Sequence, residues 1–266
     1  MDLLFSILIG IIQGITEWLP ISSKTQVLLS SEFLLGISVA VAYSFGLFME
    51  LGSIGSALIY FRHDVKRVFK ERKLLIFLVV ATFFTGLVGV PLFLISDKLL
   101  QNAYNPGIPM LVLGLILIGD GIYIKFSRQM KNREFKEMSL RDMIIIGIAQ
   151  GIAALPGVSR SGMTVSTMLL LGYKPEDAFR YSYLAYIPAA LGAVGTTLLF
   201  TKHSISIVVS QIGFLGIFTA LIFALITGVL VISFLLKIAK KNTVYFIDFT
   251  LGLIAIIISS LIILGI

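Results

Sequence analysis

The sequence contains no cysteine, so disulfide bonds and thiolate-ligated metal sites are excluded. Charged residues make up only 13% of the 266 positions, whereas a soluble globular domain has about a quarter. Regular alternation of apolar and polar residues is absent, which argues against an outer-membrane barrel. Hydrophobic residues make up 58% of the chain and form recurring apolar runs of roughly eighteen or more residues. The composition therefore predicts an all-α, polytopic membrane protein.

The positive charge is unevenly distributed along the chain. Of the 21 lysines and arginines, six lie in 62–73, six in 125–141 and three in 237–241. Clusters of this kind mark the cytoplasmic loops of membrane proteins, so we expect these three segments on the cytoplasmic side. The net charge of +7 is thereby explained by topology, and no nucleic-acid binding is expected.

The apolar runs predict about six transmembrane helices, and two further segments do not fit as simple spans. The segments 3–36 and 143–172 each have two apolar arms around a polar middle that contains proline and serine. Two re-entrant helical hairpins would keep all basic loops on one side, and irregular backbone at this depth must face protein or a wet cavity. An ordinary loop over 22–36 is the alternative. The runs expected to span the membrane are 38–61, 74–97, 108–124, 179–200, 207–235 and 245–266.

The two unusual segments resemble each other. GIIQGITEWLPISSKT (10–25) aligns with GIAQGIAALPGVSRSG (147–162), and each precedes three apolar runs. Because three crossings separate the copies, the second copy is expected upside down, as in inverted-repeat transporters. We predict a single membrane domain, 1–266, built from repeats at about 1–124 and 143–266 and joined by the basic cytoplasmic loop 125–142. Chance similarity between apolar segments is the alternative.

Together, the tips of the two hairpins would form one polar cluster inside the membrane. Ionisable groups at this depth are costly and mark functional sites. Ser159 can cap the helix that follows it, and Arg160 matches the geometry of phosphate oxygens. Glu17 beside such an anion site can ligate a divalent metal or act as a base. The cluster, which suits phosphoryl transfer, comprises Gln13, Glu17, Ser22, Ser23, Lys24 and Gln26 with Ser159, Arg160, Ser161 and Thr164.

Purely structural roles remain open for most of these residues. The hydroxyl groups can cap or link helices, Arg160 can pair with Glu17, and Gln13 and Gln150 can join helices without taking part in chemistry. Glu50 lies where run 38–61 passes the first hairpin, and we interpret it as an auxiliary ligand or a partner of the site.

The motifs GxxQGxTEWLPxSS (10–23) and LPGxSRSGMT (155–164), with LGSI at 51–54, resemble the signatures of the undecaprenyl-diphosphate phosphatase (bacitracin-resistance) family. The resemblance covers essentially the whole chain. It implies a multi-pass plasma-membrane hydrolase that converts a polyprenyl diphosphate to the monophosphate and so recycles the lipid carrier of cell-envelope glycans. It also implies inverted repeats, a divalent cation (Mg²⁺ or Ca²⁺) and a site facing the external side. A homodimer is an open alternative for the assembly.

The family's motifs also assign roles to residues. Glu17, Ser23 and Arg160 are implied as catalytic, with Glu17 as metal ligand and Gln13 as a further candidate. Glu50 is a further candidate ligand because of its position in run 38–61. The remaining motif positions are implied to bind substrate: Gln13, Ser22, Gln26, Ser159, Ser161 and Thr164.

The chain departs from the family at one position. Bacterial members usually continue Ser-Ser-Thr-Gly-His, and Gln26 replaces this histidine. A glutamine amide cannot transfer a proton near neutral pH. Three explanations are open. Another group, such as Glu17 or Glu50, supplies the acid or base, or the reaction is slower or uses another lipid carrier. Alternatively, the protein moves a polyprenyl phosphate without hydrolysing it. A lipid translocase or scramblase is therefore the alternative function.

Overall fold

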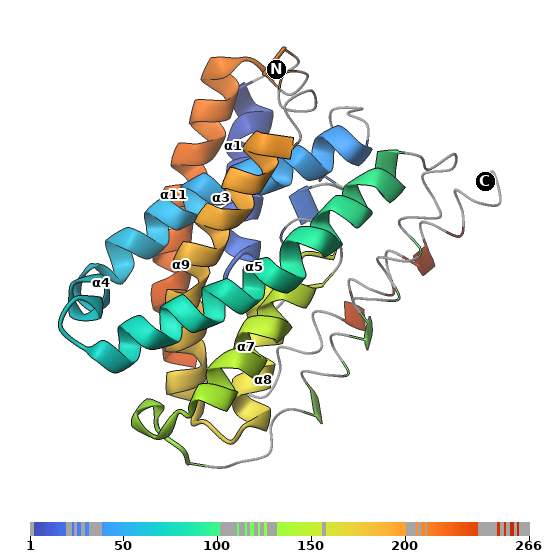
Figure 1. Ribbon diagram of the computed structural model, residues 1–266. Helices are drawn as coiled ribbons and strands as arrows, with labels where there is room; N and C mark the ends of the chain where they lie inside the picture. Colours follow the sequence, from blue (N-terminus) through green and yellow to red (C-terminus); the bar gives the residue numbers. More distant parts are fainter. Residues whose placement is uncertain are drawn as a thin grey trace.

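The computed structural model describes residues 3–19, 39–101, 132–155, 158–200 and 212–238, together with single positions in 23–31, 111–126, 206–210 and 249–260. The described residues are helical apart from short connections (Figure 1). The helices are α1 (Leu3–Thr16), α3 (Val39–Tyr60), α4 (Arg62–Val68), α5 (Arg72–Gln101), α7 (Leu140–Ile152), α8 (Arg160–Leu170), α9 (Pro175–Phe200) and α11 (Phe214–Ile238), with a 3₁₀ turn at Phe135–Glu137.

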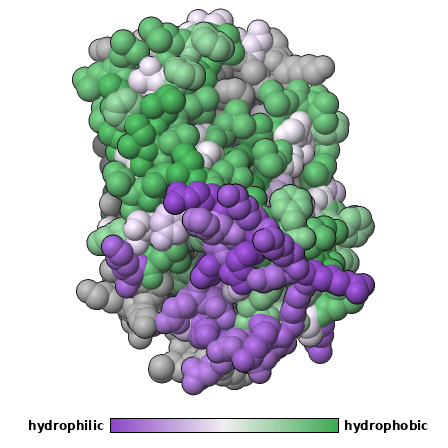
Figure 2. Space-filling view, turned by 90° about the vertical axis from the view of Figure 1, so that its left-hand side faces the viewer, coloured by the Kyte–Doolittle hydropathy of each residue, from purple (hydrophilic) through white to green (hydrophobic). Residues whose placement is uncertain are grey.

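Three of these helices are long and apolar enough to cross a membrane: Arg72–Ser96 in α5, Pro175–Phe200 and Phe214–Lys237 in α11. Figure 2 shows hydrophilic side chains gathered at one end of the molecule and hydrophobic side chains over most of the remaining face. This division suits a bilayer, because exposed apolar side chains face lipid there. The expectation of an all-helical membrane protein agrees with these features, whereas six spans remain a prediction.

The expected runs correspond to helices with some differences. Run 38–61 becomes α3 and run 179–200 lies within α9, while α5 extends beyond 74–97 at both ends. Run 207–235 is interrupted at Gly213, whose φ of 77° suits glycine, and α11 begins after it. Runs 108–124 and 245–266 lie largely outside the described residues.

The first two basic segments contain structure that their charge did not predict. Segment 62–73 contains α4, and segment 125–142 contains the 3₁₀ turn. The two segments meet, because the Lys73 ammonium donates a hydrogen bond to the Lys136 carbonyl. They therefore share one end of the molecule, as the sequence predicted.

Helix α1 packs along α11, and two glycines allow the close approach. A Cβ at Gly10 would collide with the backbone of Ala220, and one at Gly14 would collide with the side chain of Thr227. Helix α7 packs along α5 in the same manner. There, a Cβ at Gly147 would collide with Ala81, and one at Gly151 would crowd Val88.

Two helix breaks meet near the middle of the molecule (Figure 1). The first follows α1, where 17–19 form a turn, and the second separates α7 from α8. Ser159 caps α8 by accepting a hydrogen bond from the Gly162 N–H at 3.1 Å, as the sequence predicted. The two breaks lie against each other, because the Ser161 hydroxyl donates a hydrogen bond to the Leu19 carbonyl.

Candidate active site

Glu17 is the centre of the polar cluster. It is 4% exposed, and its Oε2 accepts hydrogen bonds from Gln13 Nε2 and Ser23 Oγ, each at 2.7 Å. Its other oxygen, Oε1, forms a salt bridge with Nη2 of Arg160, the first residue of α8. One carboxylate thus joins a hydroxyl and an amide of its own segment to a guanidinium 143 positions away.

The end of α1 sets the position of this carboxylate. The Glu17 N–H donates to the Gln13 carbonyl at 3.0 Å, so the last helical turn places both side chains on one face. Gln13 Nε2 also donates to Ser53 Oγ of α3 at 3.1 Å. The amide therefore holds Glu17 against α3 and leaves its own Oε1 without a partner among the described residues.

Arg160 is the first residue of α8, and several contacts hold it in place. Its guanidinium carbon lies 3.7 Å from the centre of the Tyr186 ring, a cation–π contact. Thr164 Oγ1 donates to the Arg160 carbonyl at 2.9 Å. Only one guanidinium nitrogen meets Glu17, and Nη1 is buried with no partner in the described part of the chain. An oxyanion is the natural partner for that nitrogen.

Hydrogen bonds to the backbone join the two hairpin tips. Ser161 Oγ donates to the Leu19 carbonyl at 2.6 Å, and Tyr183 Oη donates to the Trp18 carbonyl at 2.6 Å. The rings of Tyr183 and Tyr186 meet Trp18 edge-on at 5.1 and 5.0 Å. Ser159 and Ser161 lie 3.3 Å apart, oxygen to oxygen. Ser161 therefore joins the two tips, and Ser159 contacts Ser161 within its own segment.

The structure brings together most of the predicted site residues. Gln13, Glu17, Ser23, Ser159, Arg160, Ser161 and Thr164 form one connected region. The pairing of Arg160 with Glu17, considered above as a structural alternative, is present. Gln26 is helical and half-buried. Ser22 and Lys24 lie outside the described residues.

Sequence reasoning missed the residues that surround this cluster. Ser53, Trp18, Tyr183 and Tyr186 all contact it, and Thr164 Oγ1 contacts the Ser182 hydroxyl. The motif YSYLAY (181–186) inside an apolar helix was the available signal, because buried tyrosine hydroxyls need hydrogen-bond partners.

The oxygen atoms present suit a hard divalent cation. Magnesium and calcium prefer carboxylate and amide oxygens, which Glu17 and the unpartnered Gln13 Oε1 supply. Glu50 lies three residues before Ser53 on α3 and is 2% exposed. Within the described ranges, no group of three or more His, Cys, Asp or Glu residues comes together. The donors therefore fit a metal that substrate oxygens or water help to ligate.

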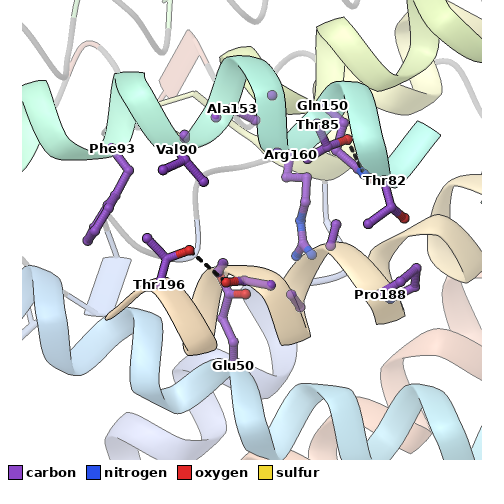
Figure 3. A pocket seen from close by; sticks show the side chains of 18 residues that line it. Glu50, Thr82, Thr85, Val90, Phe93, Gln150, Ala153, Arg160, Pro188 and Thr196 are labelled. Carbon is purple, nitrogen blue, oxygen red and sulfur yellow. Dashed lines mark hydrogen bonds between the residues drawn. The ribbon is translucent and has the colours of Figure 1, made fainter. Parts of the chain in front are cut away.

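A cavity of about 150 Å³ lies between α5, α7 and α9, next to the cluster. Arg160 and Glu50 point into it from opposite sides (Figure 3), and most of the remaining wall is apolar or glycine. The Tyr186 hydroxyl donates to the Glu50 carbonyl at 3.2 Å, linking this wall to the aromatic cluster. The arrangement offers an anion contact next to an apolar chamber.

Comparison with known proteins yields consistent matches over the chain. The model of the bacitracin resistance protein BacA family matches residues 6–257. An undecaprenyl-diphosphatase of Saccharolobus islandicus is 71% identical over 98% of both chains. An undecaprenyl-diphosphatase of Sulfurisphaera tokodaii is 66% identical, and the match covers 99% of this chain and 100% of the relative. An undecaprenyl-diphosphatase of Pyrobaculum aerophilum is 40% identical, and the match covers 96% of this chain and 97% of the relative.

Proposed function

The chain belongs to the bacitracin resistance protein BacA family, and from this membership and the geometry of its site we propose that it is an undecaprenyl-diphosphatase. The enzyme hydrolyses a polyprenyl diphosphate to the monophosphate and inorganic phosphate, which recycles the lipid carrier. The observation that carries this proposal is the hydroxyl–carboxylate–guanidinium chain formed by Ser23, Glu17 and Arg160.

Arg160 is the proposed phosphate-binding group. Its Nη1 has no partner in the described residues, and its pairing with Glu17 can be exchanged for a pairing with the incoming diphosphate. A guanidinium fork binds phosphate oxygens in pairs and neutralises charge that develops on them. Binding of substrate would thus release Glu17 Oε1 at the moment when a base is required.

Ser23 is the proposed nucleophile, and Glu17 is its base. The Ser23 hydroxyl already donates to Glu17 at 2.7 Å, so its proton moves to the carboxylate as the oxygen attacks the terminal phosphorus. The bond to the bridging oxygen breaks, and polyprenyl monophosphate leaves with the electron pair and receives the proton. Water then cleaves the serine phosphate, releases inorganic phosphate and restores the Ser23 hydroxyl.

A divalent cation, Mg²⁺ or Ca²⁺, is proposed as cofactor. Glu17 and Gln13 Oε1 would hold it, with Glu50 as a further ligand. When bound, such an ion neutralises charge on the diphosphate oxygens. Addition of chelator to the purified protein, followed by return of Mg²⁺ or Ca²⁺, tests this requirement by phosphate release.

The proposed architecture is a pair of inverted repeats with re-entrant hairpins and about six spans in the plasma membrane, with the site open to the external side. Reciprocal helix contacts support it, since α1 packs on α11 of the second repeat and α7 packs on α5 of the first. The contacts share one spacing, because Gly10 and Gly14 meet positions 220 and 227, and Gly147 and Gly151 meet positions 81 and 88.

Phosphate release from a long-chain prenyl diphosphate by purified Ser23→Ala protein tests the reaction. We expect at least a hundredfold loss of kcat, because the variant lacks the nucleophile. Wild-type protein that binds the lipid and never hydrolyses it would instead support the translocase alternative. Wild-type rates in Ser23→Ala would assign the attack to water.

A further inference from the structure

When the two repeats are aligned, residues that line the cavity beside Arg160 correspond to residues of the catalytic cluster. In the aligned motifs, Gln13 corresponds to Gln150, and the same spacing places Glu17 at Ala154. Both Gln150 and Ala154 line the cavity. The second repeat therefore retains the amide and has a methyl group where the first repeat has its catalytic acid.

Helices α3 and α9 show the same replacement. LGSIGSAL (51–58) aligns with LGAVGTTL (191–198), so Glu50 corresponds to Ala190 and Ser53 to Ala193. Ala190 and Ala193 also line the cavity. Three polar positions around the catalytic centre thus have alanine counterparts here. Glu50 and Arg160 also line the chamber, but most of its wall is apolar or glycine, and such a wall favours an apolar occupant.

The cavity opens to the outer surface between α5 and α9. Gly86 and Gly192 line it and are themselves exposed, and a Cβ on either would meet no atom within 4 Å. Large apolar side chains flank this opening: Leu87 is 60% exposed on α5, and Leu191 is 51% exposed on α9. In a membrane protein such side chains face lipid, so the opening lies where a lipid tail can enter.

We propose that this cavity seats the first isoprene unit of the substrate, the five-carbon unit bonded to the diphosphate. Arg160 lines both the cavity and the pocket around Glu17, so a diphosphate held by this residue has its organic end directed into the chamber. An apolar cavity of about 150 Å³ holds a benzene molecule, which is close in size to one isoprene unit. The rest of the chain then extends through the opening into lipid.

This seat rests on the proposed phosphatase function and adds a prediction about chain length. Because the seat contacts only the first unit, an obstruction in it should impair short and long prenyl diphosphates equally. A groove that measured the whole chain would impair long substrates most. The two arrangements can therefore be distinguished by the loss of kcat/KM for prenyl diphosphates of increasing chain length.

Gly192→Leu is the test variant, and Gly195→Leu is its matched control. Both glycines lie on α9 with no atom within 4 Å of an added Cβ, but only Gly192 lines the cavity. We expect kcat/KM of Gly192→Leu to fall at least tenfold, by the same factor for geranyl, farnesyl and longer prenyl diphosphates. Gly195→Leu should stay within twofold of wild type. Gly86→Leu tests the opposite wall if Gly192→Leu does not fold.

Binding is measured separately through Trp18, the single tryptophan of the chain, which lines the pocket around Glu17 and Arg160. Its fluorescence should report a higher Kd for farnesyl diphosphate in Gly192→Leu and an unchanged Kd for inorganic phosphate. Equal behaviour of Gly192→Leu and Gly195→Leu, or a loss that grows with chain length, would overturn the seat. Absence of hydrolysis by wild type would overturn the phosphatase function, and the binding comparison would still decide on the seat.

Discussion

At the scale of single residues, Glu17 and Arg160 are coupled because each compensates a buried charge of the other. Their side chains are 2% and 12% exposed. Removing one partner leaves an unpaired buried charge, which typically costs about 3–5 kcal/mol, whereas removing both costs much less. The pair therefore serves structure and chemistry together.

A double-mutant cycle separates these two roles. We expect Glu17→Gln and Arg160→Leu each to lower Tm and to abolish phosphate release. The double variant should recover much of the Tm loss and remain inactive, because both the base and the phosphate contact are gone. Thermal unfolding in detergent and a phosphate assay measure the two quantities. Additive losses of Tm would show that the two charges do not compensate each other.

Gln26 is the residue at which this chain departs from the family's usual histidine. A glutamine offers hydrogen bonds but no proton, and general acid–base groups typically accelerate reactions by about 10²–10⁴-fold. We expect Gln26→His to raise kcat severalfold at pH 6 and to add a limb to the pH–rate profile. If the histidine acts as an acid, kcat falls as pH rises through its pKa, near 6.5 when unperturbed.

Gln26→Asn is the control for this change, since it keeps an amide and adds no titratable group. A profile of Gln26→His that parallels the wild-type profile would show that position 26 does not reach the reacting atoms.

At the scale of elements, the second hairpin is closed at its base by a network around Asp142. Asp142 Oδ2 accepts from the Tyr173 hydroxyl at 2.6 Å and from Arg133 at 2.8 Å, and Arg133 also donates to the Leu171 carbonyl. This network joins the start of α7 to the end of α8. The position of Arg160 at the opposite end of α8 therefore depends on it.

Asp142→Asn tests this dependence. Burial acts to raise the pKa of Asp142, but hydrogen bonds from Tyr173, Ser139 and Arg133 outweigh it and lower the pKa overall. Its contribution to stability is thus present above about pH 4, the ordinary range for aspartate, and is lost in stronger acid. At neutral pH we expect Asp142→Asn to cost about 1–3 kcal/mol and to lower kcat more than it raises KM.

Hydrogen exchange of α8 amides and steady-state kinetics measure these two effects. Lys174→Ala is a control nearby, because it removes a partly exposed pair with Glu134 and leaves Asp142 intact. Unchanged exchange in α8 of Asp142→Asn would contradict the proposed closure.

The sequence predicted the local features of these elements but not the contacts between distant ones. Proline, glycine and serine in PGVS (156–159) predicted the helix break and the Ser159 cap, because these signals are local. The contacts of Tyr183 with Trp18 and of Ser53 with Gln13 join residues more than 35 positions apart. Such contacts depend on which helices pack together, and an apolar helix pattern carries no information about its neighbour.

At the scale of the whole molecule, the absence of cysteine makes topology directly measurable. The native protein is already a cysteine-free background, so each single substitution gives one labelled site. The two histidines are suitable positions. His63 lies in the first basic segment and is exposed. His203 lies between runs 179–200 and 207–235, in a nearly uncharged connection that the positive-inside rule places on the external side.

We expect a membrane-impermeant maleimide to label His203→Cys in intact cells and to label His63→Cys only after the membrane is opened, since basic segments remain in the cytoplasm. Lys70→Cys, also exposed in the first basic segment, should behave like His63→Cys. Phosphate release by each variant confirms that the labelled protein is folded. Labelling of His63→Cys in intact cells would reverse the proposed orientation. Labelling of both positions from one side would contradict the three crossings, 74–97, 108–124 and 179–200, that are expected between them.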